Sequence, residues 1–393
     1  MGNKNSINIV WIYPGELVDA LDQATWLSTT KSLRDLGCKV TLLNIGQKNC
    51  TAIDGVKVQC IPASKIYFWG KLFFHLKIIP IILSQWKNLD IVLLHPYSVM
   101  FILPSRFFCV VFYHKRKRPL FVVDIRTVFM ASEGEKNWKT YLRKIYFDLM
   151  LWAANQWADG QTAITDRLAQ DVGIPKDKIW GVWPSGVDLD DFKTFQLIRR
   201  WVIDNDPLNL IYIGTMNDGR NLMAFGRAVK IARDKGMHFI MTYIGDGYER
   251  AALEKFAQEY PNSIHVHPPI PHKEIPNWLS KAHIGVLPFP NQVKFQVSSP
   301  IKLFEYMAAG IPILATRIVC HTDVVQNGNY VFWIEKPDET GFISALTQIW
   351  NCRNNLKEMG DSASEASKQW TWNESAKKLQ AALELGLSRF CEV

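Results

Sequence analysis

Residues 7–44 read INIVWIYPGELVDALDQATWLSTTKSLRDLGCKVTLLN. The apolar, β-branched run at 7–13 ends at a Pro-Gly pair, which predicts a strand followed by a loop. Apolar residues at helical spacing over 21–36 predict a helix that ends at a glycine, and residues 39–44 predict the next strand. Because strand, helix and strand in this order form a βαβ unit, this stretch predicts a parallel pair of strands.

The same alternation continues along both halves of the chain. Residues 91–94 and 120–125 are apolar without alternation, as buried parallel strands are. Turn residues gather after 184, so we place a domain boundary near 186–206. A second series starts with predicted strands at 208–213 and 239–244. The sequence therefore predicts an α/β protein of two Rossmann-like doubly wound domains that face a cleft, with ligands at the carboxyl ends of the strands.

Composition excludes several classes of protein. The 393 residues are 48% hydrophobic and 21% charged, which suits a large folded core and excludes disordered, collagen-like, coiled-coil and disulfide-scaffold chains. The net charge of +8 suits nucleic acid, anionic membranes or phosphorylated substrates without choosing among them. The 7 cysteines show no zinc spacing and no secretory signal is evident, so we expect reduced thiols in a cytoplasmic protein. The most apolar run, residues 91–103, is better explained by a strand, a turn and a helix than by a helix that spans a membrane.

The strongest motif reads SSPIKLFEYMAAGIPILAT at residues 298–316. Ser299 suits an N-cap, Pro300 the first helical position and Gly310 the residue after the end, which together predict a helix over 300–309. Backbone amides at its positive end, from Ser298 onward, can hold phosphate oxygens.

Two side chains of this helix suit the rest of a nucleotide. Lys302 can lean toward the phosphates. Glu305 lies roughly 9 Å further on, at ~1.5 Å per residue, and can accept hydrogen bonds from ribose hydroxyls. The alternative is a plain amphipathic helix with a surface Lys–Glu pair.

This motif resembles the donor-binding signature of retaining glycosyltransferases of family 4 and of related GT-B enzymes. Further stretches resemble that family in the same order: 184–188, 211–214 with Arg220, 243–247, 266–290 and 370–372. The resemblance implies an acceptor-binding domain over 1–190, a nucleotide-sugar-binding domain over 191–365, and a helix over 366–393 that returns to the first domain. Val297 stands where many members of the family have a second glutamate, so inversion stays open beside retention.

The resemblance also assigns roles at the ends of strands. Gly214 and Thr215 follow a predicted strand, where a glycine permits close approach of a ligand, and Arg220 matches a basic residue that binds the diphosphate. Asp124 and Arg126 close a strand of the first half. Asp124 would orient or deprotonate an acceptor hydroxyl and Arg126 would hold a phosphate, or the two would form a pair that organises the loop.

A possible membrane surface lies in the first half. Residues 66–86 mix aromatic and aliphatic residues with Lys71 and Lys77, and a basic run follows at 114–118. Basic residues beside an amphipathic aromatic stretch suit an anionic membrane, although core packing and a solvated loop are the alternatives. We assign acceptor or membrane contact to a set of polar residues: Asp22, Lys71, Lys77, Lys115, Arg116, Lys117 and Arg118.

These observations predict a glycosyltransferase in polysaccharide or glycolipid synthesis, peripherally associated with the membrane. It would move a sugar from a UDP- or GDP-sugar, a co-substrate, to a hydroxyl of a lipid-linked saccharide. We expect no cofactor, no metal, because no DxD-like motif is placed for it, and no nucleic-acid partner. The alternatives are another GT-B enzyme such as a nucleotide-sugar epimerase, or an inactive GT-B scaffold.

Overall fold

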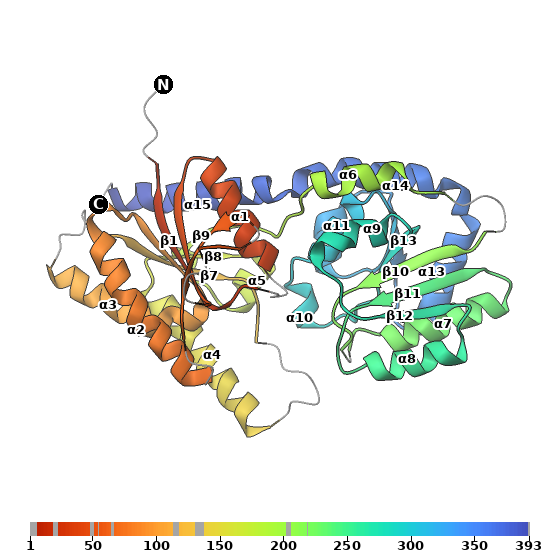
Figure 1. Cartoon of the computed structure of the whole chain (residues 1–393), viewed down its shortest axis with the longest axis horizontal. Coiled ribbons are helices and arrows are strands. Elements are labelled where there is room, and N and C mark those ends of the chain that lie inside the picture. The colour runs from red at the N-terminus through yellow and green to blue at the C-terminus, as the bar shows by residue number, and fades with distance from the viewer. Residues whose placement is uncertain are drawn as a thin grey trace. The chain divides into compact units, whose positions relative to one another are not determined.

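The computed structural model divides the chain into two units (Figure 1). It describes residues 6–18, 23–47, 51–53, 55–63, 67–112, 118–129, 137–201, 206–217 and 219–391. Unit 1 takes the described residues up to 129, those at 137–186 and those at 372–391. Unit 2 takes those at 187–371. The first unit is therefore discontinuous in sequence, and the second is inserted into it.

The described strands of unit 1 form a seven-stranded parallel sheet in the order β5-β2-β1-β6-β7-β8-β9. Its strands are β1 (Asn8–Glu16), β2 (Lys39–Ile45), β5 (Gln59–Ile61), β6 (Ile91–Leu94), β7 (Leu120–Ile125), β8 (Gly160–Ala163) and β9 (Ile179–Val182). A short hairpin joins β3 (Ala52–Ile53) and β4 (Val56–Lys57). The order reverses between β1 and β6, as in doubly wound folds.

Helices cover both faces of this sheet (Figure 1). On one face α1 (Gln23–Asp35) packs against α15 (Trp372–Cys391). On the other, α2 (Tyr67–Gln85) contacts α3 (Val99–Phe112), which in turn contacts α4 (Trp138–Trp157). Right-handed crossovers explain this split, because connections that run in opposite directions along the sheet place their helices on opposite faces. The short α5 (Asp166–Asp171) follows β8.

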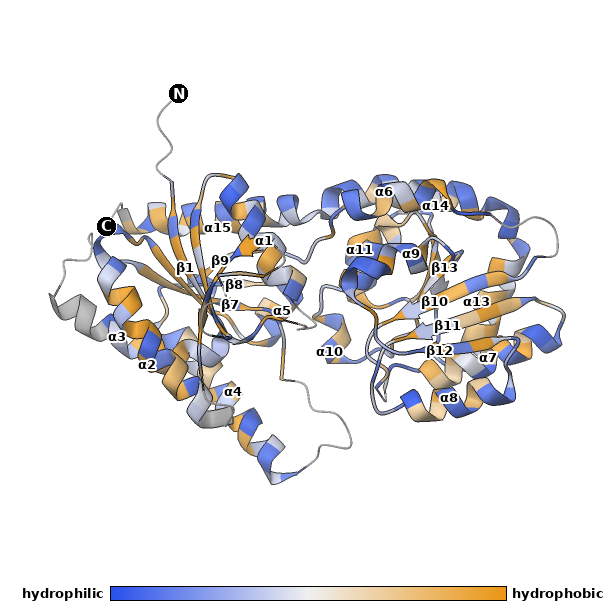
Figure 2. Cartoon of the chain, in the orientation of Figure 1, coloured by the Kyte–Doolittle hydropathy of each residue, from blue (hydrophilic) through white to orange (hydrophobic). Residues whose placement is uncertain are grey.

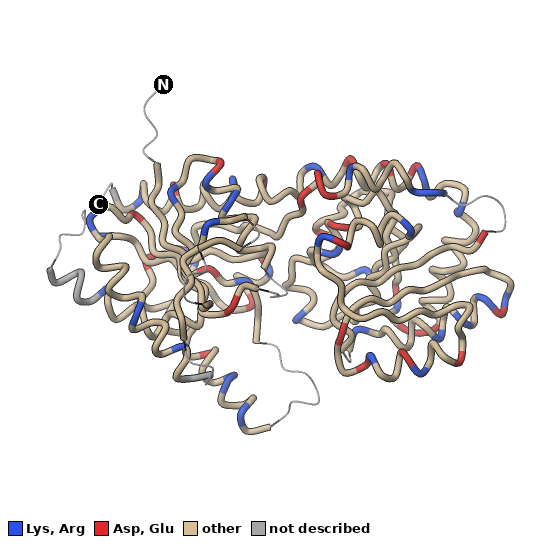
Figure 3. Tube along the Cα trace, in the orientation of Figure 1, with Lys and Arg blue, Asp and Glu red and all other residues tan. Residues whose placement is uncertain are grey.

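The described strands of unit 2 form a six-stranded parallel sheet in the order β12-β11-β10-β13-β14-β15. Its strands are β10 (Leu208–Ile213), β11 (Phe239–Ile244), β12 (Ile264–His267), β13 (Ile284–Leu287), β14 (Ile313–Thr316) and β15 (Val331–Ile334). Its helices are α6 (Asp190–Leu197), α7 (Leu222–Asp234), α8 (Arg250–Glu259), α9 (Ile275–Leu279), α10 (Val293–Gln296), α11 (Ile301–Ala308), α12 (Val319–Val325), α13 (Glu339–Asn351) and α14 (Leu356–Ser367). The strands of both sheets are mainly apolar (Figure 2), and most charges lie on helices and loops (Figure 3).

The predicted class, two Rossmann-like α/β domains, is confirmed. The helix of the strongest motif differs in detail from the prediction. It begins at Ile301 after Pro300, which occupies the N-cap position without a side-chain cap, so Ser299 is not the N-cap. Its end follows the prediction, because Gly310 directly after Ala309 has a φ of 64°, where glycine carries no steric penalty.

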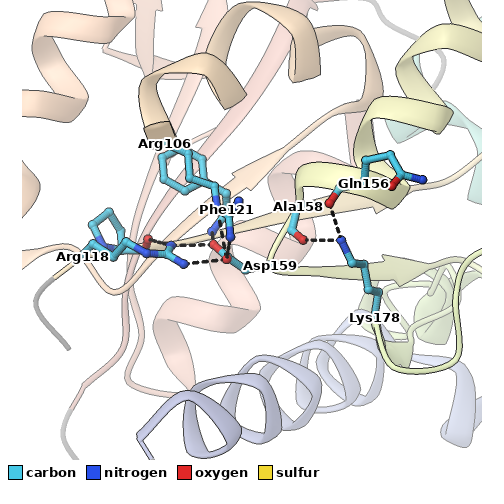
Figure 4. Close-up of polar contacts among 8 residues, drawn as sticks. Arg106, Arg118, Phe121, Gln156, Ala158, Asp159 and Lys178 are labelled. Carbon is cyan, nitrogen blue, oxygen red and sulfur yellow. Dashed lines mark hydrogen bonds and ion pairs between the residues drawn. The ribbon is translucent and has the colours of Figure 1, made fainter. Parts of the chain in front are cut away.

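A buried ion-pair network holds the helical layer of unit 1 to its sheet (Figure 4). Asp159, just before β8, accepts hydrogen bonds from Arg118 (2.7 Å), from Arg106 of α3 (2.7 Å) and from the Phe121 amide of β7 (2.9 Å). Burial raises the pKa of Asp159, but Arg118, Arg106 and this amide outweigh it and hold the pKa below its ordinary value. The carboxylate therefore stays ionised inside the unit.

Candidate active site

The loops that follow β10 and β11 pack against each other at the carboxyl edge of the unit 2 sheet. Gly214, Gly245 and Gly247 have φ angles of 145°, 148° and 151°, a region that favours glycine. The Met216 amide donates to the Asp246 carbonyl at 2.7 Å. A Cβ on Gly245 would lie 1.9 Å from the carbonyl oxygen of Gly214. Glycine thus lets two backbones approach at the edge where ligands bind in such sheets.

Lys302, in the first turn of α11, lies against this pair of loops. A Cβ on Gly214 would lie 2.1 Å from Lys302 Cε, so the glycine makes room for the lysine side chain. Burial and the nearby charge of Arg220 lower the pKa of Lys302, and Glu305 opposes them. In the described part of the chain no residue forms an ion pair or hydrogen bond with Lys302. The site thus holds two neighbouring cations, as an anion-binding site would.

Two phenylalanine rings and a tyrosine hold Arg220. Its Cζ lies 5.1 Å from the ring centroid of Phe289 and 5.5 Å from that of Phe295. Its Nη1 donates to the Tyr212 hydroxyl at 3.4 Å, and that hydroxyl donates to the Thr215 carbonyl at 2.7 Å. The sequence predicted Arg220 and Thr215 as site residues but not this aromatic support. A cation over ring faces is a favourable arrangement, so the guanidinium is held at the loop.

Glu305 is buried, and it contacts a histidine that the sequence analysis missed. The Glu305 side chain is 6% exposed, and its Oε1 lies 3.0 Å from Nε2 of His272, whose side chain is 56% exposed. His272 belongs to a short 3-10 turn, His272–Glu274, that leads into α9. The alternative of a surface Lys–Glu pair is wrong, because Glu305 is buried and pairs with His272. The carboxylate is fixed in orientation before any ligand arrives.

The two serines before α11 lie at its amino end, as predicted, and both are partly exposed. The Ser298 hydroxyl donates to the Phe295 carbonyl at 2.8 Å, which secures the turn after α10. Val297 is 1% exposed and belongs to the interior. The position that carries a second glutamate in the resembling family is thus an apolar, buried position here.

In unit 1, Asp124 and Arg126 both bind the segment 183–185. Asp124, at the carboxyl end of β7, is 0% exposed and accepts hydrogen bonds from Trp183 Nε1 (2.8 Å) and from Thr162 (2.7 Å). Arg126 lies 3.6 Å over the Trp183 ring and donates to the Trp183 carbonyl and the Ser185 hydroxyl, both at 3.4 Å. The two side chains approach to 3.9 Å. Burial raises the pKa of Asp124, and Arg126 and these hydrogen bonds oppose it.

The predicted surface residues divide into three groups. Lys71 Nζ lies 4.3 Å over the Tyr97 ring, and Lys77, which is exposed, donates to the Pro62 carbonyl at 2.7 Å. The prediction for Arg118 is wrong, because its side chain is 3% exposed and pairs with Asp159 at 2.7 Å. The remaining members lie outside the described residues: Asp22, Lys115, Arg116 and Lys117.

Among the residues that the structure describes, no cluster of three or more His, Cys, Asp or Glu side chains is arranged to hold a metal ion. Within the same residues, no helix is both long and apolar enough to span a bilayer.

Comparisons with solved structures identify the fold. The fold matches that of the Anabaena protein HepE in complex with UDP, at 12% identity and a TM-score of 0.71. The match covers 96% of this chain and 99% of HepE. The fold also matches a glycosyltransferase from Rickettsia africae over 97% and 99%, at 15% identity and a TM-score of 0.69. The chain therefore has the two-domain GT-B fold of glycosyltransferases.

A family model matches part of unit 2. Residues 207–352 match the family described as Glycosyl transferases group 1, and the matched stretch includes the motif at 298–316.

Two curated relatives match parts of the chain. A teichuronic acid biosynthesis glycosyltransferase of Bacillus subtilis, described as putative, is 32% identical over 89 residues, which are 23% of this chain and 22% of that protein. A colanic acid biosynthesis glycosyltransferase of Escherichia coli, also described as putative, is 27% identical over 172 residues, 43% of this chain and 39% of that protein. The chain thus matches well under half the length of either relative.

Proposed function

We propose that the protein transfers a glycosyl group from a UDP- or GDP-sugar to a hydroxyl of a lipid-linked saccharide during polysaccharide or glycolipid synthesis. The observation that carries the proposal is the pair of cations at the carboxyl edge of the unit 2 sheet. Lys302 and Arg220 favour a diphosphate there, because burial and the nearby charge of Arg220 destabilise the Lys302 ammonium until an anion binds beside both. The names of the relatives, which concern polysaccharide synthesis, support the product class.

The proposed donor pose uses three parts of the site. The diphosphate lies at the amino end of α11, beside Lys302 and Arg220, where backbone amides and the helix dipole favour negative charge. Gly214 leaves room for the Lys302 side chain beside the phosphates. Glu305, oriented by His272, accepts hydrogen bonds from the ribose hydroxyls. The UDP complex of HepE, which shares this fold, supports a uridine nucleotide.

The chemistry then depends on stabilising the leaving group. As the bond between the sugar and the diphosphate breaks, negative charge accumulates on the departing phosphate. Preorganised cations and helix amides stabilise that charge more than they stabilise the ground state. We propose a metal-independent, retaining transfer on this basis, with inversion as the alternative because Val297 replaces the usual glutamate.

The role of Asp124 and Arg126 is proposed from their contacts. Both hold Trp183 and its neighbours, and the Asp124 carboxylate is buried beneath them. These contacts favour organisation of the loop over direct proton transfer to an acceptor. We propose that the pair positions the carboxyl edge of the unit 1 sheet, where the acceptor would bind.

Calorimetric titration with UDP and with GDP tests the donor site. We expect micromolar binding of one nucleotide, weakened about tenfold by Glu305→Ala because a charge-assisted ribose contact is worth about 1.4 kcal/mol. The control is Glu365→Ala, which removes an exposed glutamate of α14 that pairs with Lys368. Absence of binding of both nucleotides would overturn the donor site and favour the scaffold alternative.

A product assay separates transfer from epimerisation. Incubated with a UDP-hexose and a lipid-linked saccharide, the enzyme should release UDP and form a longer saccharide lipid. Appearance of an epimerised UDP-hexose without UDP release would favour the epimerase alternative instead.

A further inference from the structure

Helix α4 carries an apolar stripe that faces away from unit 1. Trp138, Leu142, Ile145, Leu149 and Trp152 are between 42% and 69% exposed, and so is Tyr141. At 100° per residue these positions fall within an arc of roughly 100°, the width of stripe that usually faces a core. The opposite side of the helix is buried and includes Phe147, Met150 and Ala154. The helix therefore has two apolar faces, and only one of them is covered.

Helix α2 repeats this arrangement. Trp69, Phe73, Leu76 and Leu83 are between 46% and 54% exposed. They stand at i, i+4, i+7 and i+14, the same phase as on α4, while Phe74, Ile78 and Ile82 on the other side are buried. Both helices belong to the layer on one face of the sheet, and α3 contacts each of them (Figure 1). Figure 2 shows apolar residues along both helices.

The charges on these two helices are nearly all positive (Figure 3). Their sequences contain Lys71 and Lys77 on α2 and Lys139, Arg143 and Lys144 on α4, against the single acidic residue Asp148. Asp148 pairs with Lys144 at 2.5 Å. The two stripes are thus accompanied by cations, which favour a negatively charged partner.

We propose that the outward stripes of α2 and α4 form an interfacial surface that inserts into an anionic lipid bilayer. Aromatic and aliphatic side chains enter the boundary between headgroups and acyl chains, and the lysines and arginine contact anionic headgroups. A second copy of the chain fits less well. A symmetric contact would place the same patch on both subunits and bring its cations face to face.

The surface adjoins the edge of the sheet where an acceptor would bind. Tyr97 lies in the short 3-10 turn Pro96–Ser98, just after the carboxyl end of β6. Lys71 of α2 lies over its ring at 4.3 Å, and the Tyr146 ring of α4 stacks on it with centroids 6.1 Å apart. Both helices therefore meet at a strand end of the unit 1 sheet. This inference rests on the proposed function, since a bilayer held here would present a lipid-linked acceptor to that edge.

Vesicle sedimentation tests the surface with two variants of the full chain. One combines Trp138→Ser, Leu142→Ser and Ile145→Ser on the stripe of α4. The matched control combines Leu197→Ser and Ile198→Ser, which are 87% and 60% exposed in unit 2. Vesicles of phosphatidylglycerol with phosphatidylcholine are compared with phosphatidylcholine alone, at low and high salt, and light scattering gives the mass in solution.

We expect wild type and control to bind the anionic vesicles, more weakly at high salt, and the stripe variant to bind about tenfold or more weakly. Equal vesicle binding by the stripe variant and the control would overturn the proposal. So would a wild-type dimer that the stripe variant dissociates.

Titration of each protein with UDP and GDP separates the two proposals. Nucleotide binding without vesicle binding would overturn the membrane surface and leave the donor site intact. Vesicle binding without nucleotide binding would overturn the donor site and leave the membrane surface intact.

Discussion

At the scale of single residues, glycine decides how closely the donor site can be assembled. Gly214 has a φ of 145°, and the space where its Cβ would be is filled by the Lys302 side chain. The residue therefore serves two purposes at once: it permits the backbone turn after β10 and it admits the lysine. A residue with a side chain would disfavour this backbone turn and would exclude the lysine.

Gly214→Ala should weaken UDP or GDP binding by about tenfold or more, because Cβ would displace Lys302 from its place beside Arg220. Gly236→Ala is the matched control. Gly236 also has a positive φ, 85°, but nothing lies within 4 Å of its Cβ position. Both variants should lose about 1 to 3 kcal/mol of stability, because each places a side chain at a positive φ, and only Gly214→Ala should lose affinity in calorimetry. Unchanged affinity of Gly214→Ala would contradict the proposed place of Lys302 beside the phosphates.

The sequence predicted individual site residues better than their partners. Lys302, Glu305 and Arg220 stand in local patterns of a few residues, so motif reasoning could name them as candidates, and their role in a donor site stays a prediction. His272 lies 33 residues from Glu305, and no local spacing signals that contact. The prediction of surface contact for Arg118 was wrong for the same reason. Arg118 ends a basic run, but its anion, Asp159, is 41 residues away and lies inside the unit.

At the scale of elements, Asp159 joins parts of unit 1 that lie far apart in the sequence. Its carboxylate ties α3, Arg118 in the segment that leads into β7, and β7 itself to the start of β8. Nearby, Lys178 donates to the carbonyls of Gln156 (2.8 Å) and Ala158 (3.1 Å) at the end of α4 (Figure 4). The helical layer is therefore anchored to the sheet by polar contacts as well as by apolar packing.

Asp159→Asn should lower the free energy of unfolding at pH 7 by about 3 to 5 kcal/mol, because Arg118 would stay buried without its anion. Since folding depresses the pKa of Asp159, its charge stabilises the folded state fully above its unfolded pKa, about 4. That contribution is lost as the pH falls through the lower pKa of the folded state. Denaturant titrations at several pH values should show the gap between wild type and variant closing in acid. Asp148→Asn, an exposed position on α4, is the control, and an equal loss there would refute the argument.

Helix α4 shows what an apolar pattern cannot decide. The structure has this helix at Trp138–Trp157. Apolar residues occur on both of its sides, so periodicity alone does not say which side is covered. Only the packing of Phe147 and Met150 against unit 1 leaves Trp138 and Leu142 outside.

At the scale of the whole molecule, the two parallel sheets follow from the alternation of apolar strands with helices, and the sequence predicted them. The short strand β5 and the hairpin of β3 and β4 were not predicted, because two or three residues carry too little pattern. The units divide at 186/187 and 371/372, close to the expected boundaries at 190/191 and 365/366. Turn residues alone fix such boundaries only to within several positions.

Unit 1 should depend on α15, which packs on α1 and β9 and buries Leu379 and Leu383. Leu383→Asp should lower the stability of unit 1 by about 3 kcal/mol or more, because a carboxylate would replace a fully buried side chain. Leu385→Asp on the same helix, at a position 45% exposed, should be nearly neutral. Calorimetric nucleotide binding by unit 2 should persist in both variants. Loss of binding in Leu383→Asp would show instead that the units do not fold independently.

The discontinuity of unit 1 has a consequence for synthesis on the ribosome. Domains generally fold as units in the order in which they emerge. Here unit 2, at 187–371, emerges whole, whereas the sheet of unit 1 lacks the cover of α15 until residues 372–391 have been made. The half that is translated first is therefore the half that matures last. The strand Asn8–Glu16 is translated first and shares a core with α15, so it is the segment for which a nascent-chain chaperone would have the longest time to bind.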